Sequence, residues 1–353
     1  MSGLKKRKKT KLFLACILFF FSAEISSQNT TDEFTILFYN VENLFDIQNN
    51  PKTLDDEFTP NGDRRWTYKR FQKKLTDISK VLLNASGWQP PQLIALCEVE
   101  NLYVLEKLLS ETPLQSHPYK ILHKESPDRR GIDVALLYNE EEFYPIEYQY
   151  ISLKNRHDSV LQTREILYVS GILAETDTVH LFANHWPSRY SGLLESLENR
   201  TLAAKILRNK MEDLQQKFAN PKIVIVGDFN DQPSDESLLI HLGAAELPQP
   251  GETNVQQLYN LSYPWMDDDL GTLKYQSQWS VFDQIIVSGS LLEPDGQIFT
   301  RPEWATIVKL PFLFEKDVRY GGMKINRTYS GFRYNGGFSD HLPVMLKIQI
   351  NRQ

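Results

Sequence analysis

The segment Lys222 to Asn230 (KIVIVGDFN) places a carboxylate and a carboxamide at the end of an apolar stretch. Residues 223–226 are all β-branched, which is typical of a strand that is buried on both faces. Because residues two apart on a strand point the same way, Asp228 and Asn230 can face one site. Open α/β sheets place their reactive groups at the carboxyl ends of strands. Plain turns also favour Asp and Asn, so a functional site needs partners elsewhere in the chain.

Candidate partners stand at or near the ends of other predicted strands. They are Asn40, Glu42, Glu98, Asp283, Asp340, His185 and His341. Carboxylate and amide oxygens suit a hard cation such as Mg²⁺ or Mn²⁺. His341 directly follows Asp340, so this pair offers a metal ligand and a base together. The sequence contains no cysteine cluster, HExxH, glycine-rich nucleotide loop or GxSxG, so zinc and serine-nucleophile chemistry lack support.

An alternation of strands and helices must position these residues. Strands are predicted at 34–39, 92–96, 131–138, 143–153, 164–174, 179–183, 223–226, 281–287 and 343–350. Helices are predicted at 66–85, 102–109, 193–218 and 236–242. Strands interleaved with helices, together with long antiparallel runs, predict two packed sheets with helices outside. The segment from Leu291 to Gly337 fits no regular element.

The predicted helix at 66–85 is amphipathic, because apolar residues recur at helical spacing from Phe71 to Ala85. Its basic residues are expected on a solvated face: Lys69, Arg70, Lys73 and Lys74. Glu100 would share a strand face with Glu98, but we expect it to be solvated. Cys97 lies in an apolar strand and is expected to be a small buried side chain.

The N-terminal residues 1–27 resemble a secretory signal peptide. A basic stretch from Lys5 to Lys11 precedes the apolar run Leu12 to Phe21, which is too short for a stable membrane span. An uncleaved signal anchor is the alternative. Cys16 lies inside the apolar run, and Phe13, Leu14 and Ala15 before it make a poor lipoprotein box, so a lipid anchor is not expected. The sequence thus predicts a secreted or periplasmic protein whose single domain spans residues 32–352.

The charge of the chain changes when the signal peptide is removed. The full sequence has 39 basic and 45 acidic residues, and residues 1–27 contain six of the former and one of the latter. The remainder therefore has 33 basic and 44 acidic residues, a net charge of −11. An acidic surface argues against broad electrostatic binding of nucleic acid, so any phosphate contact requires a local basic patch.

Seven motifs in order carry a family resemblance. They are YNVENLFD, LCEVEN, RGIDVALLY, NHWPS, GDFND, DQIIVSG and SDHLPV. Together they resemble the endonuclease/exonuclease/phosphatase superfamily, which has the DNase I-like fold, and secreted bacterial endonuclease-like members above all. The resemblance spans residues 34–350. It implies a four-layered α/β sandwich, with two packed mixed β-sheets flanked by helices, and divalent-metal-dependent hydrolysis of phosphoesters.

The resemblance also implies which residues bind the cofactor and the substrate. Glu98 is similar to the main ligand of Mg²⁺ (or Mn²⁺), assisted by Glu42 and Asp340. Asn40 is similar to the amide that orients these metal ligands and contacts the substrate. Arg130 and Arg164 are expected to contact the substrate.

The catalytic residues follow from the same resemblance. His341 is similar to the base that takes a proton from the attacking water, and Asp283 to the carboxylate that orients this histidine. Asp228 and Asn230 resemble the pair that orients the nucleophile and a phosphate oxygen. His185 resembles the second histidine, which stabilises charge on the phosphate or assists the leaving oxygen.

Three functions remain open at this point. The first is an endonuclease that hydrolyses phosphodiesters of DNA or RNA. The second is a phosphatase or phospholipase-like hydrolase of a small phosphoester, such as an inositol phosphate or a lipid headgroup, which the acidic charge favours. The third is an inactive binding module. A monomer without an obligate protein partner is expected. The segment 291–337 is either a lid or substrate wall, with Arg301, Arg319, Arg327 and Arg333, or a decorated surface loop.

Overall fold

The computed structural model describes residues 32–87, 89–189, 192–249, 251–268 and 270–351. The predicted signal peptide lies outside the described residues. No helix in the described ranges is long and apolar enough to cross a membrane.

The first sheet is mixed and is built around β1 (Asp32–Leu44). Its order is β14 (Ile298–Phe299), β20 (Val344–Ile350), β1, β2 (Leu93–Val99), β4 (Asp133–Asn139) and β3 (Tyr119–His123), with β15 (Ala305–Ile307) also on β20. The β1–β2 pair is parallel and the other pairs are antiparallel. The carboxyl ends of β1 and β2 therefore lie at the same edge of the sheet.

The second sheet is also mixed and contains the segment KIVIVGD as β8 (Lys222–Asp228). Its order is β5 (Phe143–Ile151), β6 (Ile166–Leu173), β7 (Asp177–His185), β8, β13 (Asp283–Ser288), β10 (Leu258–Asn260) and β9 (Ala244–Ala245). Because β7 and β8 run parallel, with His185 paired to Asp228, their carboxyl ends coincide.

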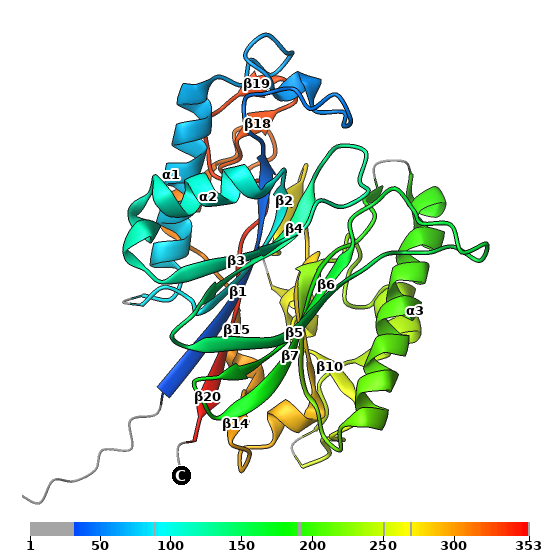
Figure 1. The fold of residues 1–353 in the computed structure, drawn as a ribbon. Coiled ribbons are helices and arrows are strands. Elements are labelled where there is room, and N and C mark those ends of the chain that lie inside the picture. Colours follow the sequence, from blue (N-terminus) through cyan, green and yellow to red (C-terminus); the bar gives the residue numbers. More distant parts are fainter. Residues whose placement is uncertain (1–31, 88, 190–191, 250, 269, 352–353) are drawn as a thin grey trace, which may run out of the picture. The chain divides into compact units, whose positions relative to one another are not determined.

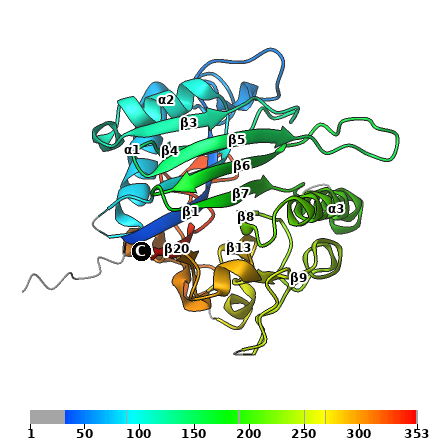
Figure 2. The same ribbon diagram turned by 60° about the horizontal axis from the view of Figure 1, so that its bottom comes forward.

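The two sheets pack face to face and helices cover their outer faces (Figures 1 and 2). One apolar core joins both sheets with α1 (Tyr68–Asn84) and α2 (Leu102–Ser110). A second core joins the outer face of the second sheet with α3 (Leu193–Lys217) and a π-helix (Ser237–Leu242). The residues of α1 that are apolar at helical spacing are buried, as their pattern predicts. The predicted four-layered α/β sandwich is confirmed.

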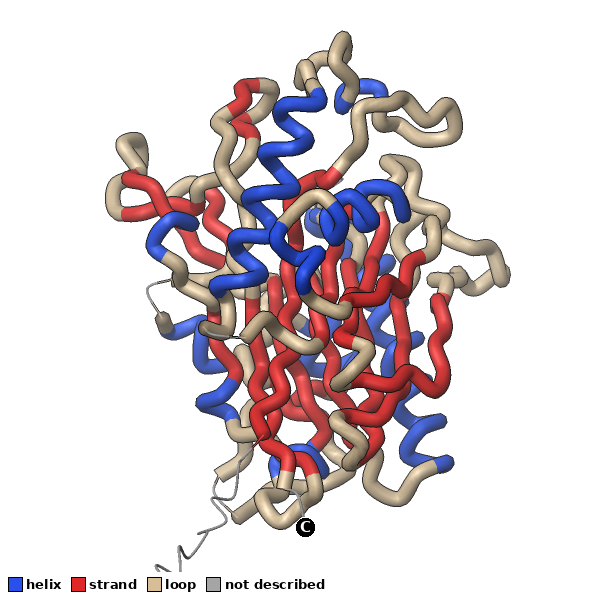
Figure 3. The backbone as a smooth tube through the Cα atoms, turned by 60° about the vertical axis from the view of Figure 1, so that its left-hand side comes forward, coloured by secondary structure: helices blue, strands red, loops and turns tan. Residues whose placement is uncertain are grey.

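The structure adds elements that the sequence pattern did not reveal. The strand β3 was not predicted, and it pairs with β4. Segment 291–337 contains β14 and β15, which extend the first sheet, and short hairpins. These hairpins are β16 (Phe314–Lys316) with β17 (Met323–Ile325), and β18 (Tyr329–Ser330) with β19 (Arg333–Tyr334). A further hairpin joins β11 (Leu273–Tyr275) to β12 (Gln278–Ser280). Short 3₁₀ turns connect other elements at Asp56–Phe58, Pro113–Ser116, Tyr263–Asp267, Gly289–Leu292, Pro302–Trp304 and Pro311–Leu313. Loops gather beyond the ends of the strands (Figure 3).

The close pairing of β7 and β8 requires a glycine beside the candidate site. Gly227 pairs with Asn184. A Cβ atom at position 227 would lie 2.5 Å from the Asn184 Cβ and 2.6 Å from its carbonyl oxygen. Real side chains do not approach a neighbouring backbone this closely, so any larger residue would push the two strands apart.

We therefore expect Gly227→Ala to lower the free energy of unfolding by about 1–3 kcal/mol through overpacking. Urea denaturation followed by circular dichroism measures this change. Gly296→Ala is the comparison and should destabilise less, because its Cβ would meet its nearest backbone oxygen at 3.0 Å rather than at 2.6 Å. Equal stability of Gly227→Ala and the unmodified protein would contradict the steric explanation.

Candidate active site

Asp228 lies where the carboxyl end of β8 faces the first sheet, and its carboxylate is buried. The Asn40 Nδ2 atom of β1 donates to Asp228 Oδ2 at 3.1 Å. The backbone N–H of Asn230 donates to Asp228 Oδ1 at 3.0 Å. Asn40 Oδ1 in turn accepts the backbone N–H of Glu42 at 3.0 Å. Asp228 thus accepts hydrogen bonds from two other predicted site residues, Asn40 of the first sheet and Asn230 of its own loop.

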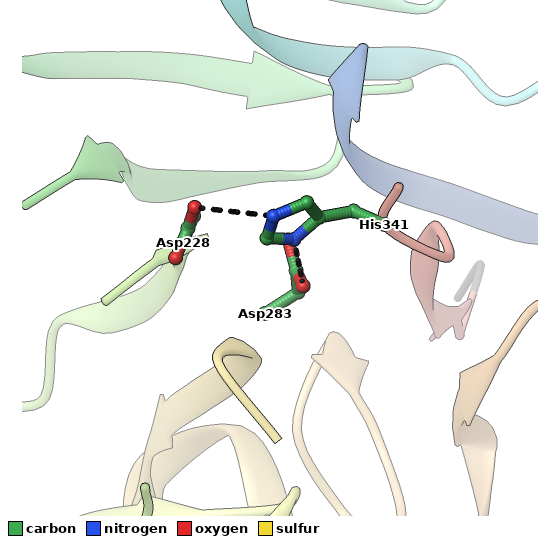
Figure 4. A group of neighbouring side chains, drawn as sticks. All are labelled: Asp228, Asp283 and His341. Carbon is green, nitrogen blue, oxygen red and sulfur yellow. Dashed lines mark hydrogen bonds and ion pairs between the residues drawn. The ribbon is translucent and has the colours of Figure 1, made fainter. Parts of the chain in front are cut away.

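His341 and Asp283 form a buried pair beside Asp228 (Figure 4). His341 Nδ1 lies 2.7 Å from Asp283 Oδ2, and His341 Nε2 lies 3.8 Å from Asp228 Oδ2. A carboxylate can only accept, so Nδ1 is the donor and Nε2 faces Asp228. Burial disfavours the charged ring, but Asp283 and Asp228 outweigh it and hold the pKa of His341 well above its ordinary value.

The carboxyl group of Asp228 is itself shifted. Burial and the charge of Asp283 raise its pKa to about 6, against the opposing effect of His341. Asp228, Asp283 and His341 lie close enough together to hold a metal ion. The 2.7 Å bond, however, already uses His341 Nδ1 and Asp283 Oδ2. Asp283 thus holds Nδ1 of the His341 ring and leaves Nε2 directed toward Asp228.

His185 ends β7 on the other side of Asp228. Its Nε2 atom lies 3.7 Å from Asp228 Oδ2. Its Nδ1 atom is buried and has no hydrogen-bond partner among the described residues. Burial, followed by the charges of Arg164, Arg130 and His341, lowers the pKa of His185 well below its ordinary value. The pKa values of the two rings are therefore shifted in opposite directions, which favours the protonated form of His341 and the neutral form of His185.

The three predicted metal ligands gather around Arg327. The guanidinium lies 3.3 Å from Glu42 Oε1 and 2.7 Å from Asp340 Oδ2, and it is close enough to Glu98 for an electrostatic effect. Burial and Asp340 raise the pKa of Glu42. The three carboxylates outnumber the single guanidinium, so negative charge remains that a divalent cation could neutralise. Carboxylate oxygens are ligands that fit Mg²⁺ or Mn²⁺.

An unusual backbone turns these carboxylates toward one another. Glu42 and Glu98 have positive φ angles of 51° and 62°. The pairing of β2 with β4 is irregular between Cys97 and Val99. The backbone N–H of Asn43, also at positive φ, donates to Glu98 Oε2 at 3.0 Å. The irregularity breaks the alternation of the strand, so Glu98 and Glu100 do not share a face as expected from the sequence.

The prediction that Glu100 is solvated was wrong, since only 5% of the residue is exposed. Its Oε2 atom accepts the backbone N–H of Asp46 at 2.6 Å. Burial, together with the neighbouring charges of Asp46 and Asp55, raises the pKa of Glu100 to about 8. This carboxyl group holds the loop after β1 against the end of β2. The prediction that Cys97 is buried is confirmed.

The two predicted substrate-binding arginines differ in their surroundings. Arg164 is buried, pairs with Asp128 at 2.9 Å and donates to the Trp186 carbonyl. Arg130 is 44% exposed and lies 3.6 Å from Asp128. The same Trp186 carbonyl accepts a bond of 3.1 Å from Asn230 Nδ2. Arg164 thus supports the loop beside Asn230, while Arg130 is the more accessible cation.

Lys74 is a residue of the site that the sequence interpretation missed. It was expected on the solvated face of α1, but it is buried. Its Nζ atom donates to Thr328 Oγ1 at 2.6 Å and to the Phe338 carbonyl. Burial lowers the pKa of Lys74 to about 8, although Glu42 raises it. The helical spacing contained the signal, because Lys74 lies three residues after Phe71 on the apolar face.

A four-layered α/β sandwich with carboxylates and two histidines at one edge of its sheets defines a DNase I-like hydrolase fold. A model of the endonuclease/exonuclease/phosphatase family matches residues 35–350, so the chain belongs to this family of phosphoester hydrolases. No match was found among curated protein sequences.

Solved structures support the same fold. An endonuclease/exonuclease/phosphatase family protein from Bacteroides thetaiotaomicron is similar with a TM-score of 0.54 and 14% identity, covering 91% of this chain and 99% of that one. The human Nocturnin catalytic domain with bound sulfate has a TM-score of 0.53 and 15% identity over 90% and 94%. The mannosyl-6-phosphatase Bt3783 of Bacteroides thetaiotaomicron has a TM-score of 0.54 and 16% identity over 89% and 99%.

The raised pKa of Glu100 makes stability depend on pH. Between the unfolded pKa near 4.5 and the folded pKa of about 8, only the folded state retains the proton. Stability is therefore lost as the pH rises through this window, on the order of 1–4 kcal/mol in total. Glu100→Gln should flatten this dependence in urea titrations from pH 5 to 9. Glu106→Gln, on the exposed face of α2, is the control and should retain the slope.

Asp283 is expected to control the protonation of His341. In protein kept in EDTA, Asp283→Asn should lower the pKa of the His341 ring, because it removes the nearest negative charge. NMR titration of the histidine Cε1–H signals measures the shift. The exposed ring of His157 serves as an internal control. An unchanged His341 titration would show that Asp283 does not set its charge.

Proposed function

We propose that this chain is a divalent-metal-dependent phosphodiester hydrolase, and that it acts as an endonuclease on DNA or RNA. The observation that carries the proposal is the His341–Asp283 pair, whose free Nε2 points at Asp228. The carboxylates of Glu42 and Asp340, joined through Arg327, lie at the same edge of the sheets. A base, its orienting group and a cation site are the parts that in-line hydrolysis of a phosphate requires.

His341 would accept the proton of the attacking water at Nε2, since Asp283 holds Nδ1. Asp228 and Asn230 would orient that water and a phosphate oxygen, because they stand beside the ring on the β8 side. Glu42, Glu98 and Asp340 would hold Mg²⁺ or Mn²⁺. A bound divalent cation would neutralise the phosphate, lower the pKa of the attacking water and, by charge repulsion, favour the neutral imidazole that a base requires.

His185 would act on the phosphate or on the leaving oxygen, on the side opposite the attacking water. Its low pKa favours the neutral ring near pH 7, in which one nitrogen carries a hydrogen and can donate a hydrogen bond to a phosphate or leaving oxygen. Arg130, which is accessible, and Arg164, which is buried nearby, supply positive charge on this side. We also infer, from its basic and then apolar N-terminus, that the chain works outside the cytoplasm. We further propose that it does so as a monomer.

A phosphatase or phospholipase-like activity on a smaller phosphoester is the second candidate. The net charge of −11 for residues 28–353 opposes a long polyanion. A cavity of ≈ 360 Å³ beside Asp340 is also small for a polymer. An inactive binding module is the third candidate, and the complete set of site residues argues against it.

The first test is hydrolysis of supercoiled plasmid, of the diester bis(p-nitrophenyl) phosphate and of the monoester p-nitrophenyl phosphate with Mg²⁺ or Mn²⁺. We expect His341→Ala to lower the rate by about 10²–10⁴-fold through loss of the base. EDTA should abolish the activity. His157→Ala, in an exposed loop, is the control and should retain it.

The outcomes separate the candidates. Nicking of plasmid by the unmodified protein alone supports the endonuclease. Cleavage of small phosphoesters without nicking would overturn the nuclease assignment and favour the second candidate. Inactivity on every substrate would favour the binding module.

A further inference from the structure

A polar cavity of ≈ 360 Å³ adjoins the candidate cation site. Its charged lining residues are Lys274, Asp317, Arg319, Lys324, Arg327 and Asp340. Four of these six are basic. Apart from Lys274 and Asp340, they come from the segment 291–337. The cavity is thus largely the product of the segment that fits no regular pattern in the sequence.

Part of this charge is already neutralised inside the protein. Lys274 Nζ lies 2.9 Å from Asp317 Oδ2, and both side chains are buried. Lys274 also donates to the Met323 carbonyl at 2.9 Å. The backbone N–H groups of Arg319 and Tyr320 donate to Asp317 Oδ1 at 3.1 Å and 3.0 Å. This network fixes the hairpin, and it leaves the other three cations to face the cavity.

Arg319 and Lys324 are the cations that remain available to a ligand. The Arg319 side chain is exposed and its guanidinium lies 5.1 Å from the Tyr320 ring centroid. Lys324 pairs with Glu315 at 3.1 Å, but both side chains are more than a third exposed. Exposed ion pairs of this kind are weak, so an anion in the cavity could compete with Glu315 for the ammonium group.

Arg327 links the cavity to the site of hydrolysis. Its guanidinium lines the cavity and also lies 2.7 Å from Asp340 Oδ2 and 3.3 Å from Glu42 Oε1. An anion in the cavity would therefore lie next to the carboxylates that we assign to the cation, separated by one side chain. Guanidinium and ammonium groups converging on one space are the recognition elements of phosphate.

We propose that this cavity binds a second phosphate group of the substrate, next to the phosphate that is hydrolysed. The proposal rests on the proposed phosphoester hydrolase function. The second phosphate belongs either to a bisphosphorylated small molecule or to the neighbouring position of a nucleotide chain. The volume lies at the lower end of ligand cavities, which suits one phosphate with part of its carrier.

The test compares substrates that differ by one phosphate. One pair is glucose 1,6-bisphosphate and glucose 6-phosphate. The other is the dinucleotide pTpT and TpT, which lacks the 5′-terminal phosphate. In the unmodified protein, kcat/KM for the more phosphorylated member of at least one pair should be higher. In Arg319→Gln/Lys324→Gln this preference should fall on the order of tenfold or more, through KM.

Matched controls come from the same segment. Lys316 lies in β16 opposite β17, and Arg301 lies before the 3₁₀ turn at Pro302–Trp304. Both are exposed and neither lines the cavity. Arg301→Gln/Lys316→Gln removes the same charge and should retain the preference. Preference in the sugar pair alone or the nucleotide pair alone identifies the source of the phosphate and supports the proposal. An equal loss in both double variants would overturn it, since general electrostatics would then explain the effect.

A binding measurement separates this proposal from the hydrolase function. Inorganic phosphate is titrated calorimetrically into the protein in EDTA, where Glu42, Glu98 and Asp340, which share the single charge of Arg327, repel anions from the cation site. Binding should weaken on the order of tenfold in Arg319→Gln/Lys324→Gln and not in the control variant. If the unmodified protein hydrolyses no substrate and Arg319→Gln/Lys324→Gln still loses phosphate binding, the proposed function is wrong and the cavity proposal is supported. Equal binding to all three proteins would overturn the cavity proposal, whatever the activity.

Discussion

The candidate site depends on the burial of one carboxylate between two sheets. A buried carboxylate is costly unless each oxygen has a partner. Asp228 satisfies this requirement with the Asn40 amide from the first sheet and the Asn230 N–H from its own loop. The need for both partners fixes the edges of the two sheets against each other. His185 and His341 then flank the same oxygen at 3.7 Å and 3.8 Å. These distances are too long for direct hydrogen bonds, and a water or phosphate oxygen could bridge them.

The excess of negative charge at this edge is compensated from a distant part of the chain. Arg327 contacts Glu42 and Asp340, while the N–H groups of Thr328 and Tyr329 donate to the two Glu42 oxygens at 2.7 Å and 3.3 Å. Lys74 of α1 donates a hydrogen bond to the side chain of Thr328. β18 and β19 lie beside α1 in Figure 1. Part of the segment 291–337 therefore forms the wall of the site.

The sequence predicts the layers and most site residues because both follow local rules. Strand and helix periods give the two sheets, and the pattern of residues two apart gives Asn40 with Glu42 and Asp228 with Asn230. The role of Lys74 was missed because a charged residue on an apolar face has its partners 254 and more residues away. Glu100 was expected to be solvated, but its carboxylate accepts the backbone N–H of Asp46, which lies in the loop after β1. Pairing between distant segments decides both cases, and no local pattern specifies it.

The backbone at this edge shows why local patterns fail there. Glu42, Asn43, Glu98 and Asn230 all have positive φ angles, between 51° and 62°. Asn tolerates this conformation, whereas Glu adopts it at a cost of roughly 1–2 kcal/mol. The bonds from Thr328 to Glu42 and from Asn43 to Glu98 offset part of that cost in the folded state. A regular strand would avoid the strain, but it would turn Glu98 away from Asn43 and from the charges around Arg327. The strained geometry therefore brings the carboxylates together. A cation site needs this convergence, whereas folding alone does not require it.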